Sequence, residues 1–125
     1  MHDSRLAIIA YYLMECINNG KYHKALDPIK SELINQLEID IKGYYSGALD
    51  LGLDIAIEHN LKDSYLTTLT ILREEISKKG EFISKQQCEK IDKLSDHYMQ
   101  TQYFEDVPVN EIINWIKKVE SLIEN

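Results

Sequence analysis

The sequence predicts an all-α protein, a single compact bundle of about six helices packed as antiparallel hairpins, which forms one domain over residues 1–125. Apolar residues recur at helical spacing along most of the chain, and no segment of four or more residues alternates cleanly between apolar and polar. The chain has only five glycines and two prolines, and most of them lie where helices are expected to begin or end. Apolar residues make up 44% of the 125 residues, which is enough for a core and excludes a disordered chain.

Two helices and a short helical turn are expected in the first third of the chain. The first helix covers residues 4–19 and is followed by Gly20, which suits the left-handed position after a helix end. A helical turn follows at residues 21–26. Asp27 then caps a helix that opens with Pro28 and runs to about residue 42, before Gly43. The expected apolar stripes are Leu6, Ile9, Ala10, Leu13, Cys16 and Ile17 in the first helix, and Ile29, Leu33, Leu37 and Ile41 in the next.

The remaining helices follow the same logic. Residues 44–59 are apolar on nearly every side, so we expect them to form the central, most buried helix. Asp63 is expected to cap a helix at residues 64–79, which Gly80 ends, and Ser84 with Gln87 forms a capping box for the sixth. Asn110 is expected to cap the last helix. The inward-facing residues are expected to be Tyr65, Leu66, Leu69, Leu72 and Ile76, then Ile91, Leu94, Tyr98 and Met99, then Ile112, Ile113, Ile116, Val119 and Ile123.

A short internal similarity leaves one alternative function open. The frame G-x-Y-x-x-A-L-D occurs at residues 20–27 and again at residues 43–50. It resembles the turn and second-helix start of a tetratricopeptide unit, although the spacing is shorter than in that repeat. Two similar hairpin starts within one bundle are the favoured explanation, because such a turn needs little sequence. A helical-repeat-like adaptor or regulatory domain, with a groove for a peptide, is therefore the alternative to the function developed below.

The chain carries no sign of export or membrane insertion. The apolar run from Leu6 to Met14 lacks the basic flank and the small-residue cleavage pattern of a signal peptide. No run reaches the roughly 18 apolar residues of a membrane span. Cys16 and Cys88 lie far apart at apolar helix positions, which predicts reduced, partly buried thiols. We therefore expect a cytoplasmic protein with no membrane partner.

The common motifs of metal, nucleotide and nucleophile chemistry are absent, so we expect no enzyme, no cofactor and no metal. Three acids, Glu89, Asp92 and Asp96, precede His97 on one expected helix face, but lysines are interleaved among them. Metal ligands should converge without competing cations. This pattern therefore predicts a solvated, salt-bridged helix face.

One near-match to a catalytic signature supplies a less favoured alternative. The run from His59 to Ser64, H-N-L-K-D-S, resembles the H-x-L-K-G-S signature of histidine phosphotransfer domains, in which His59 would carry the phosphoryl group and Lys62 would neutralise it. Asp63 departs from that signature because it replaces a glycine and adds a negative charge beside the phosphate. A histidine at a helix C-terminus, where the helix dipole favours it, is the simpler interpretation.

The charge pattern points to a protein partner. With 14 basic and 21 acidic residues the net charge is −7, which disfavours direct binding of nucleic acid and favours a basic partner. Residues 38–58 and 94–116 each carry a net charge of −4. In the expected helix at 44–59, Asp50, Asp54 and Glu58 recur every four residues and would form an acidic ridge. The candidate partner-binding residues are Glu38, Asp40, Tyr44, Tyr45, Asp50, Asp54, Glu58, Tyr103, Glu105 and Asp106.

Part of the chain resembles the small helical immunity proteins that bacteria keep beside polymorphic toxins, including those of contact-dependent growth inhibition and colicin-type systems. The resemblance covers residues 44–99: a Y-x-G-A-L-x-L helix with an acidic tail from Tyr45 to Glu58, then a hairpin through Gly80-x-x-Ile83-Ser84. It implies a cytoplasmic stoichiometric inhibitor that does no chemistry. Such a protein would bind a toxin domain, usually a basic nuclease, and occlude its active site or substrate groove.

Overall fold

The structure, a computed structural model, describes residues 4–43, 51–95 and 105–124. Over these ranges the chain is a compact bundle of helices, which confirms the all-α prediction. The elements are α1 (Ser4–Asn18), the 3₁₀-helix η1 (Lys24–Ile29), α2 (Lys30–Lys42), α3 (Leu53–Glu58), α4 (Lys62–Ser77), β1 (Phe82–Ile83), α5 (Lys85–Asp92), β2 (Val107–Pro108) and α6 (Val109–Glu124).

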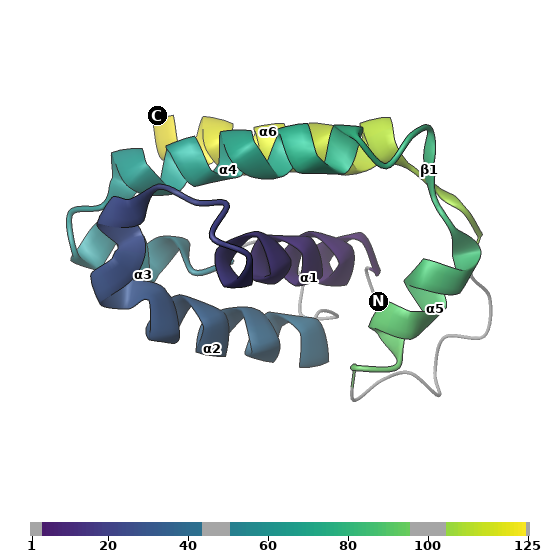
Figure 1. Ribbon diagram of the computed structural model, residues 1–125, viewed down its shortest axis with the longest axis horizontal. Coiled ribbons are helices and arrows are strands. Elements are labelled where there is room, and N and C mark those ends of the chain that lie inside the picture. The colour runs from purple at the N-terminus through teal and green to yellow at the C-terminus, as the bar shows by residue number, and fades with distance from the viewer. Residues whose placement is uncertain (1–3, 44–50, 96–104, 125) are drawn as a thin grey trace.

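The central helix of the bundle is α1. It lies between α2 on one side and the α4–α6 pair on the other, and α5 packs against it near one end of the molecule (Figure 1). Five consecutive residues, 6–10, are all buried, so α1 is covered nearly all round rather than along one stripe. The expected stripes of α1 and α2 are buried throughout, with every member at most 5% exposed.

The expectation that residues 44–59 form the central, most buried helix is wrong. In the described part of this segment the helix begins only at Leu53, and Ile57 is 48% exposed. Leu51 and Gly52 have φ values of 49° and 85°, which lie in the left-handed region and interrupt a right-handed helix. Gly52 also lies close to α2, because a Cβ on it would come within 2.7 Å of Leu33 Cδ2. The glycines of this segment therefore indicate where the helix begins better than its apolar residues do.

Two helices end in the same hydrogen-bonded motif. After α1, the Lys21 amide donates to the Cys16 carbonyl at 2.8 Å, and Gly20 occupies the left-handed position as expected. After α3, the Leu61 amide donates to the Ala56 carbonyl at 2.8 Å, with Asn60 at φ 57°. These are Schellman motifs, which satisfy carbonyls that the last turn of a helix leaves without partners.

The helix starts follow the sequence less closely. Ser84 caps α5 as expected, because its Oγ accepts a hydrogen bond from the Gln87 amide at 3.1 Å. Asp27 instead accepts a hydrogen bond from the Tyr22 hydroxyl, and Pro28 lies inside η1, so α2 starts only at Lys30. The 20–27 copy of the repeated frame is thus a helix end followed by a 3₁₀ turn. Of the 43–50 copy, only Gly43 lies within the described residues.

Asp63 and Asn110 are likewise not caps. Asp63 lies in the first turn of α4, where its charge complements the helix dipole, and Leu61 takes the capping position. Asn110 lies within α6, which already begins at Val109. The start of α6 is held by a two-stranded antiparallel ladder between β1 and β2, in which Ile83 pairs with Val107. The sequence did not predict this ladder, since each strand has only two residues.

Two further expectations concern α5 and the cysteines. The acidic face with Glu89 and Asp92 is not fully solvated, because Asp92 is only 1% exposed. Leu94 lies beyond the end of α5 and is 48% exposed, whereas Tyr98, Met99, Asp96 and His97 fall outside the described residues. Both cysteines are free and buried, as expected. Among the described residues, none of the helices combines the length and apolar character required to span a bilayer.

Candidate functional site

The structure separates the predicted partner-binding residues into two groups, and a third group lies outside the described residues. Besides Asp106, which is also exposed, four of these acidic side chains are exposed to solvent: Glu38 on α2, Asp54 and Glu58 on α3, and Glu105 before β2. Tyr44, Tyr45, Asp50 and Tyr103 fall outside the described residues.

The other two candidates, Asp40 and Asp106, take part in intramolecular hydrogen bonds. Asp40 is half-buried and accepts a hydrogen bond from the Gln36 side chain at 3.0 Å. Asp106 accepts one from the Lys85 amide at 2.7 Å, which satisfies a free donor at the start of α5. These contacts give both carboxylates a role in the fold.

The acidic ridge is not formed as a continuous helix. Asp54 and Glu58 lie one turn apart on α3, but the left-handed residues Leu51 and Gly52 separate them from the position of Asp50. A ridge of three acids would need helical backbone from residue 50 onward. The described part of the ridge is therefore a pair of acids, Asp54 and Glu58.

The fold brings the starts of the two acidic segments together. The Ser95 hydroxyl donates a hydrogen bond to the Lys42 carbonyl at 3.2 Å, which joins the region after α5 to the end of α2. A hollow of about 300 Å³ lies here, lined by Met14, Glu38, Ile41, Lys42 and Leu94. Residues from both acidic segments, 38–58 and 94–116, thus meet at one place on the surface.

Exposed apolar side chains accompany two of the exposed acids. Ile39 is 61% exposed beside Glu38, and Ile57 is 48% exposed beside Glu58. We use "acidic surface" for two exposed sites, Glu38 with Ile39 on α2, and Asp54 with Ile57 and Glu58 on α3. Apolar side chains next to charged ones are the composition expected of a protein interface with a polar rim.

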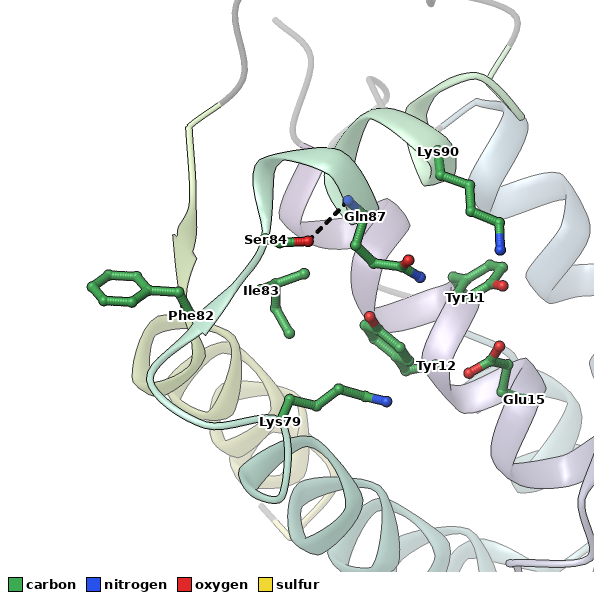
Figure 2. A pocket seen from close by; sticks show the side chains of 9 residues that line it. All are labelled: Tyr11, Tyr12, Glu15, Lys79, Phe82, Ile83, Ser84, Gln87 and Lys90. Carbon is green, nitrogen blue, oxygen red and sulfur yellow. Dashed lines mark hydrogen bonds between the residues drawn. The ribbon is translucent and has the colours of Figure 1, made fainter.

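A groove that the sequence did not predict runs between α1 and the α4–α5 connection (Figure 2). It has a volume of about 370 Å³. In Figure 2 the ammonium groups of Lys79 and Lys90 and the side-chain amide of Gln87 point toward the tyrosines of α1, whereas Phe82 points away. The lining residues are Tyr11, Tyr12, Glu15, Lys79, Phe82, Ile83, Ser84, Gln87 and Lys90.

The two tyrosines form an aromatic wall in this groove. Their rings meet edge to face with centroids 5.5 Å apart, and the Lys79 ammonium lies 4.7 Å from the Tyr12 ring centroid, within cation–π range. Burial raises the pKa of Tyr12 to about 12, although its hydrogen bond with Gln87 acts in the opposite direction. Burial and a hydrogen bond with Glu15 raise the pKa of Tyr11. Both hydroxyls therefore stay protonated near neutral pH.

A second hollow of about 110 Å³ continues the groove along α1 and α4. Here Glu75 makes ion pairs with Lys21 and with Lys78, the latter at 2.6 Å. Hydrogen bonds from these two ammonium groups lower the pKa of Glu75 to about 2. The nearby Cys16 thiol has its pKa raised to about 11, first by burial and then by the charge of Glu75, so it is a poor nucleophile.

The histidine proposed for phosphotransfer lies at a helix end. His59 is the C-cap of α3, and its Nε2 lies 3.8 Å from Glu32 Oε2. The phosphotransfer signature belongs in the middle of a helix, so this position disfavours that alternative. In the described ranges, no three His, Cys, Asp or Glu side chains gather in a way that could hold a metal ion.

No family model, curated protein or solved structure matches this chain. The fold places it among small all-α proteins, a class that hosts many unrelated functions. The acidic surface and the groove are the two features of the described surface that are candidates for a function.

Proposed function

We propose that this protein is a cytoplasmic immunity protein that neutralises a bacterial toxin domain of the basic nuclease class by binding it and occluding its active site or substrate groove. The observation that carries the proposal is the acidic surface, in which exposed isoleucines lie beside exposed carboxylates. The net charge of −7 and the resemblance of residues 44–99 to immunity proteins support it.

The acidic surface has the properties that fast inhibition of a basic partner requires. Its carboxylates attract a positively charged domain over a distance and raise the association rate. Ile39 and Ile57 supply apolar area that is removed from water on binding, which slows dissociation. The inhibitor acts by covering the partner and needs no catalytic group, cofactor or metal of its own.

The first experiment is a pull-down with tagged protein from its own cells at low and at high salt. We expect a roughly stoichiometric basic toxin domain that is lost or weakened at high salt, because screening acts on exposed charges. The captured domain is then assayed with and without the purified protein. Full inhibition at a one-to-one ratio is the expected result, and a fully active toxin in the presence of excess protein would contradict the proposal.

A pair of charge-reversal variants locates the interface. Glu38→Lys with Glu58→Lys should lower the association rate with the captured domain by about tenfold or more at low salt. The matched control is Glu74→Lys, which changes an exposed acid of α4 that lies outside the acidic surface. An equal association rate for the double variant and the control would exclude the acidic surface as the interface.

A further inference from the structure

Three hollows of the surface join into one trough. The hollow of about 110 Å³ shares Tyr12, Glu15 and Lys79 with the groove of about 370 Å³. That groove shares Ser84, Gln87 and Lys90 with a third hollow of about 420 Å³ along α5. The trough therefore follows α1, crosses the α4–α5 connection and continues along α5. An open, elongated shape suits a polymer segment better than a compact small molecule.

The charge of this trough is opposite to that of the rest of the protein. The residues that line the three hollows include four lysines and three glutamates, net +1, in a chain of net −7. Lys79 and Lys90 approach the tyrosine wall from α4's end and from α5, respectively (Figure 2). None of the ion pairs between described residues includes either of these two lysines. Two ammonium groups without a carboxylate partner thus face one groove beside an aromatic wall.

We propose that this trough binds an acidic peptide segment, with a carboxylate held between Lys79 and Lys90 and an aromatic or large apolar side chain against Tyr11 and Tyr12. Charge complementarity selects the carboxylate, and the partly exposed Tyr11 ring, backed by the buried Tyr12, supplies flat apolar area. The Gln87 side-chain amide, which is hydrogen-bonded to Tyr12, has further donor and acceptor capacity for a peptide backbone. This second binding activity goes beyond the proposed inhibition, because its ligand is acidic and its surface is separate from the acidic surface.

The position of Glu15 favours a peptide over a polyphosphate or a nucleic acid. Glu15 lines both the groove and the smaller hollow, and Glu89 lines the hollow along α5. A continuous row of phosphates would meet these carboxylates at close range. A peptide can place its carboxylates at the lysines and uncharged residues at the two glutamates.

The test uses fluorescence anisotropy with the full chain and three labelled probes: the peptide Glu-Tyr-Glu-Phe-Glu, the same peptide with Lys in place of Glu, and oligo(dT). We expect saturable binding of the acidic peptide and at least tenfold weaker binding of the other two. Equal binding of the acidic and basic peptides would overturn the proposal, as would the absence of saturable binding. Tighter binding of oligo(dT) would overturn the choice of a peptide.

Variants then assign the binding to the trough. Lys79→Glu with Lys90→Glu should weaken binding of the acidic peptide at least tenfold, and the milder Lys79→Gln with Lys90→Gln should weaken it in the same direction. The matched control is Lys62→Glu with Lys117→Glu, which reverses two exposed lysines on α4 and α6 away from the trough. A loss in the control equal to that in the trough variants would overturn the assignment.

One variant should strengthen binding, which a merely structural effect would not do. Glu15→Gln removes a carboxylate from the trough and should tighten the acidic peptide by about threefold. Unchanged or weaker binding would contradict the placement of the peptide. The acidic-surface variant Glu38→Lys with Glu58→Lys should bind the acidic peptide within twofold of the wild-type affinity. Peptide binding in the trough and toxin inhibition by the acidic surface are therefore tested independently.

Discussion

The turn that positions α3 provides the sharpest test of the fold. Gly52 caps α3 with φ 85°, and a Cβ at this position would lie 2.7 Å from Leu33 Cδ2. Leu33 is buried at 1% exposure, so its side chain cannot move into solvent to make room. Gly80 offers a matched control, because its φ is 98° and a Cβ there would meet nothing within 4 Å.

The expected free-energy costs follow from these two sites. Placing alanine in left-handed backbone costs about 1–2 kcal/mol, and this cost applies to both Gly52→Ala and Gly80→Ala. Overpacking costs about 1–3 kcal/mol, and we expect the lower half of that range at Gly52 because Leu33 Cδ2 is the end of a rotatable side chain. Gly52→Ala should therefore lower the free energy of unfolding by about 2–4 kcal/mol, and Gly80→Ala by about 1–2 kcal/mol.

Urea unfolding followed by circular dichroism measures both values. The difference of about 1–2 kcal/mol between the variants isolates the contact with Leu33, and it corresponds to roughly 4–8 °C in Tm for a domain of this size. Equal destabilisation by the two substitutions would refute the close packing of α3 against α2. A wild-type-like stability for both would refute the left-handed conformations as well.

Three further predictions concern ionisable groups near the trough. Because the pKa of Tyr12 is raised from 10.0 to about 12, its contribution to stability should be complete below pH 10 and lost as the pH rises toward 12. In Tyr12→Phe the free energy of unfolding should therefore fall less steeply over this pH range. Because the pKa of Glu75 is lowered from 4.5 to about 2, its contribution should be present above pH 4.5 and lost as the pH falls toward 2. Acid unfolding should therefore lose part of its pH dependence in Glu75→Gln and keep it in Glu74→Gln. The pKa of the Cys16 thiol is raised from 9.0 to about 11, so Cys16 should react about a hundredfold more slowly with a disulfide reagent in the folded protein than in denaturant. The reaction is followed by absorbance in the Cys88→Ala variant, in which Cys16 is the only cysteine. Equal rates in the two conditions would contradict the burial of Cys16.

Much of the secondary structure was readable from the sequence because its signals are local. The stripe from Leu33 to Ile41 depends on residues three and four apart, and Gly20 and Ser84 act on backbone groups only a few residues away. The helical periodicity, the helix end at Gly20 and the cap at Ser84 could therefore be predicted without knowing any long-range contact. The caps at Asp27 and Asp63 failed because competing local choices, a hydrogen bond from Tyr22 and a position inside the first turn, were equally compatible with the sequence.

The sites were less predictable than the helices. Charge counting selected acids such as Glu38 and Glu58, which are exposed, but it could not show that Asp106 accepts a hydrogen bond from the Lys85 amide or that Asp92 is buried. The trough left no sequence signal, because Tyr12 and Lys90 are far apart in the chain and belong to no common spacing. Only the packing of α5 against α1 brings them to one groove.

The sequence by itself determined that this chain is an acidic, all-α protein and where most of its helices lie, since composition and periodicity are properties of neighbouring residues. The tertiary structure decided that α1 occupies the centre of the bundle, and that the described part of residues 44–59 holds only the short helix α3. Hydrophobicity favours burial of a helix without choosing its neighbours, whereas a central position requires an uninterrupted helix that can pack on several sides. The left-handed backbone at Leu51 and Gly52 interrupts the helix expected in the later segment, whereas α1 is continuous from Ser4 to Asn18.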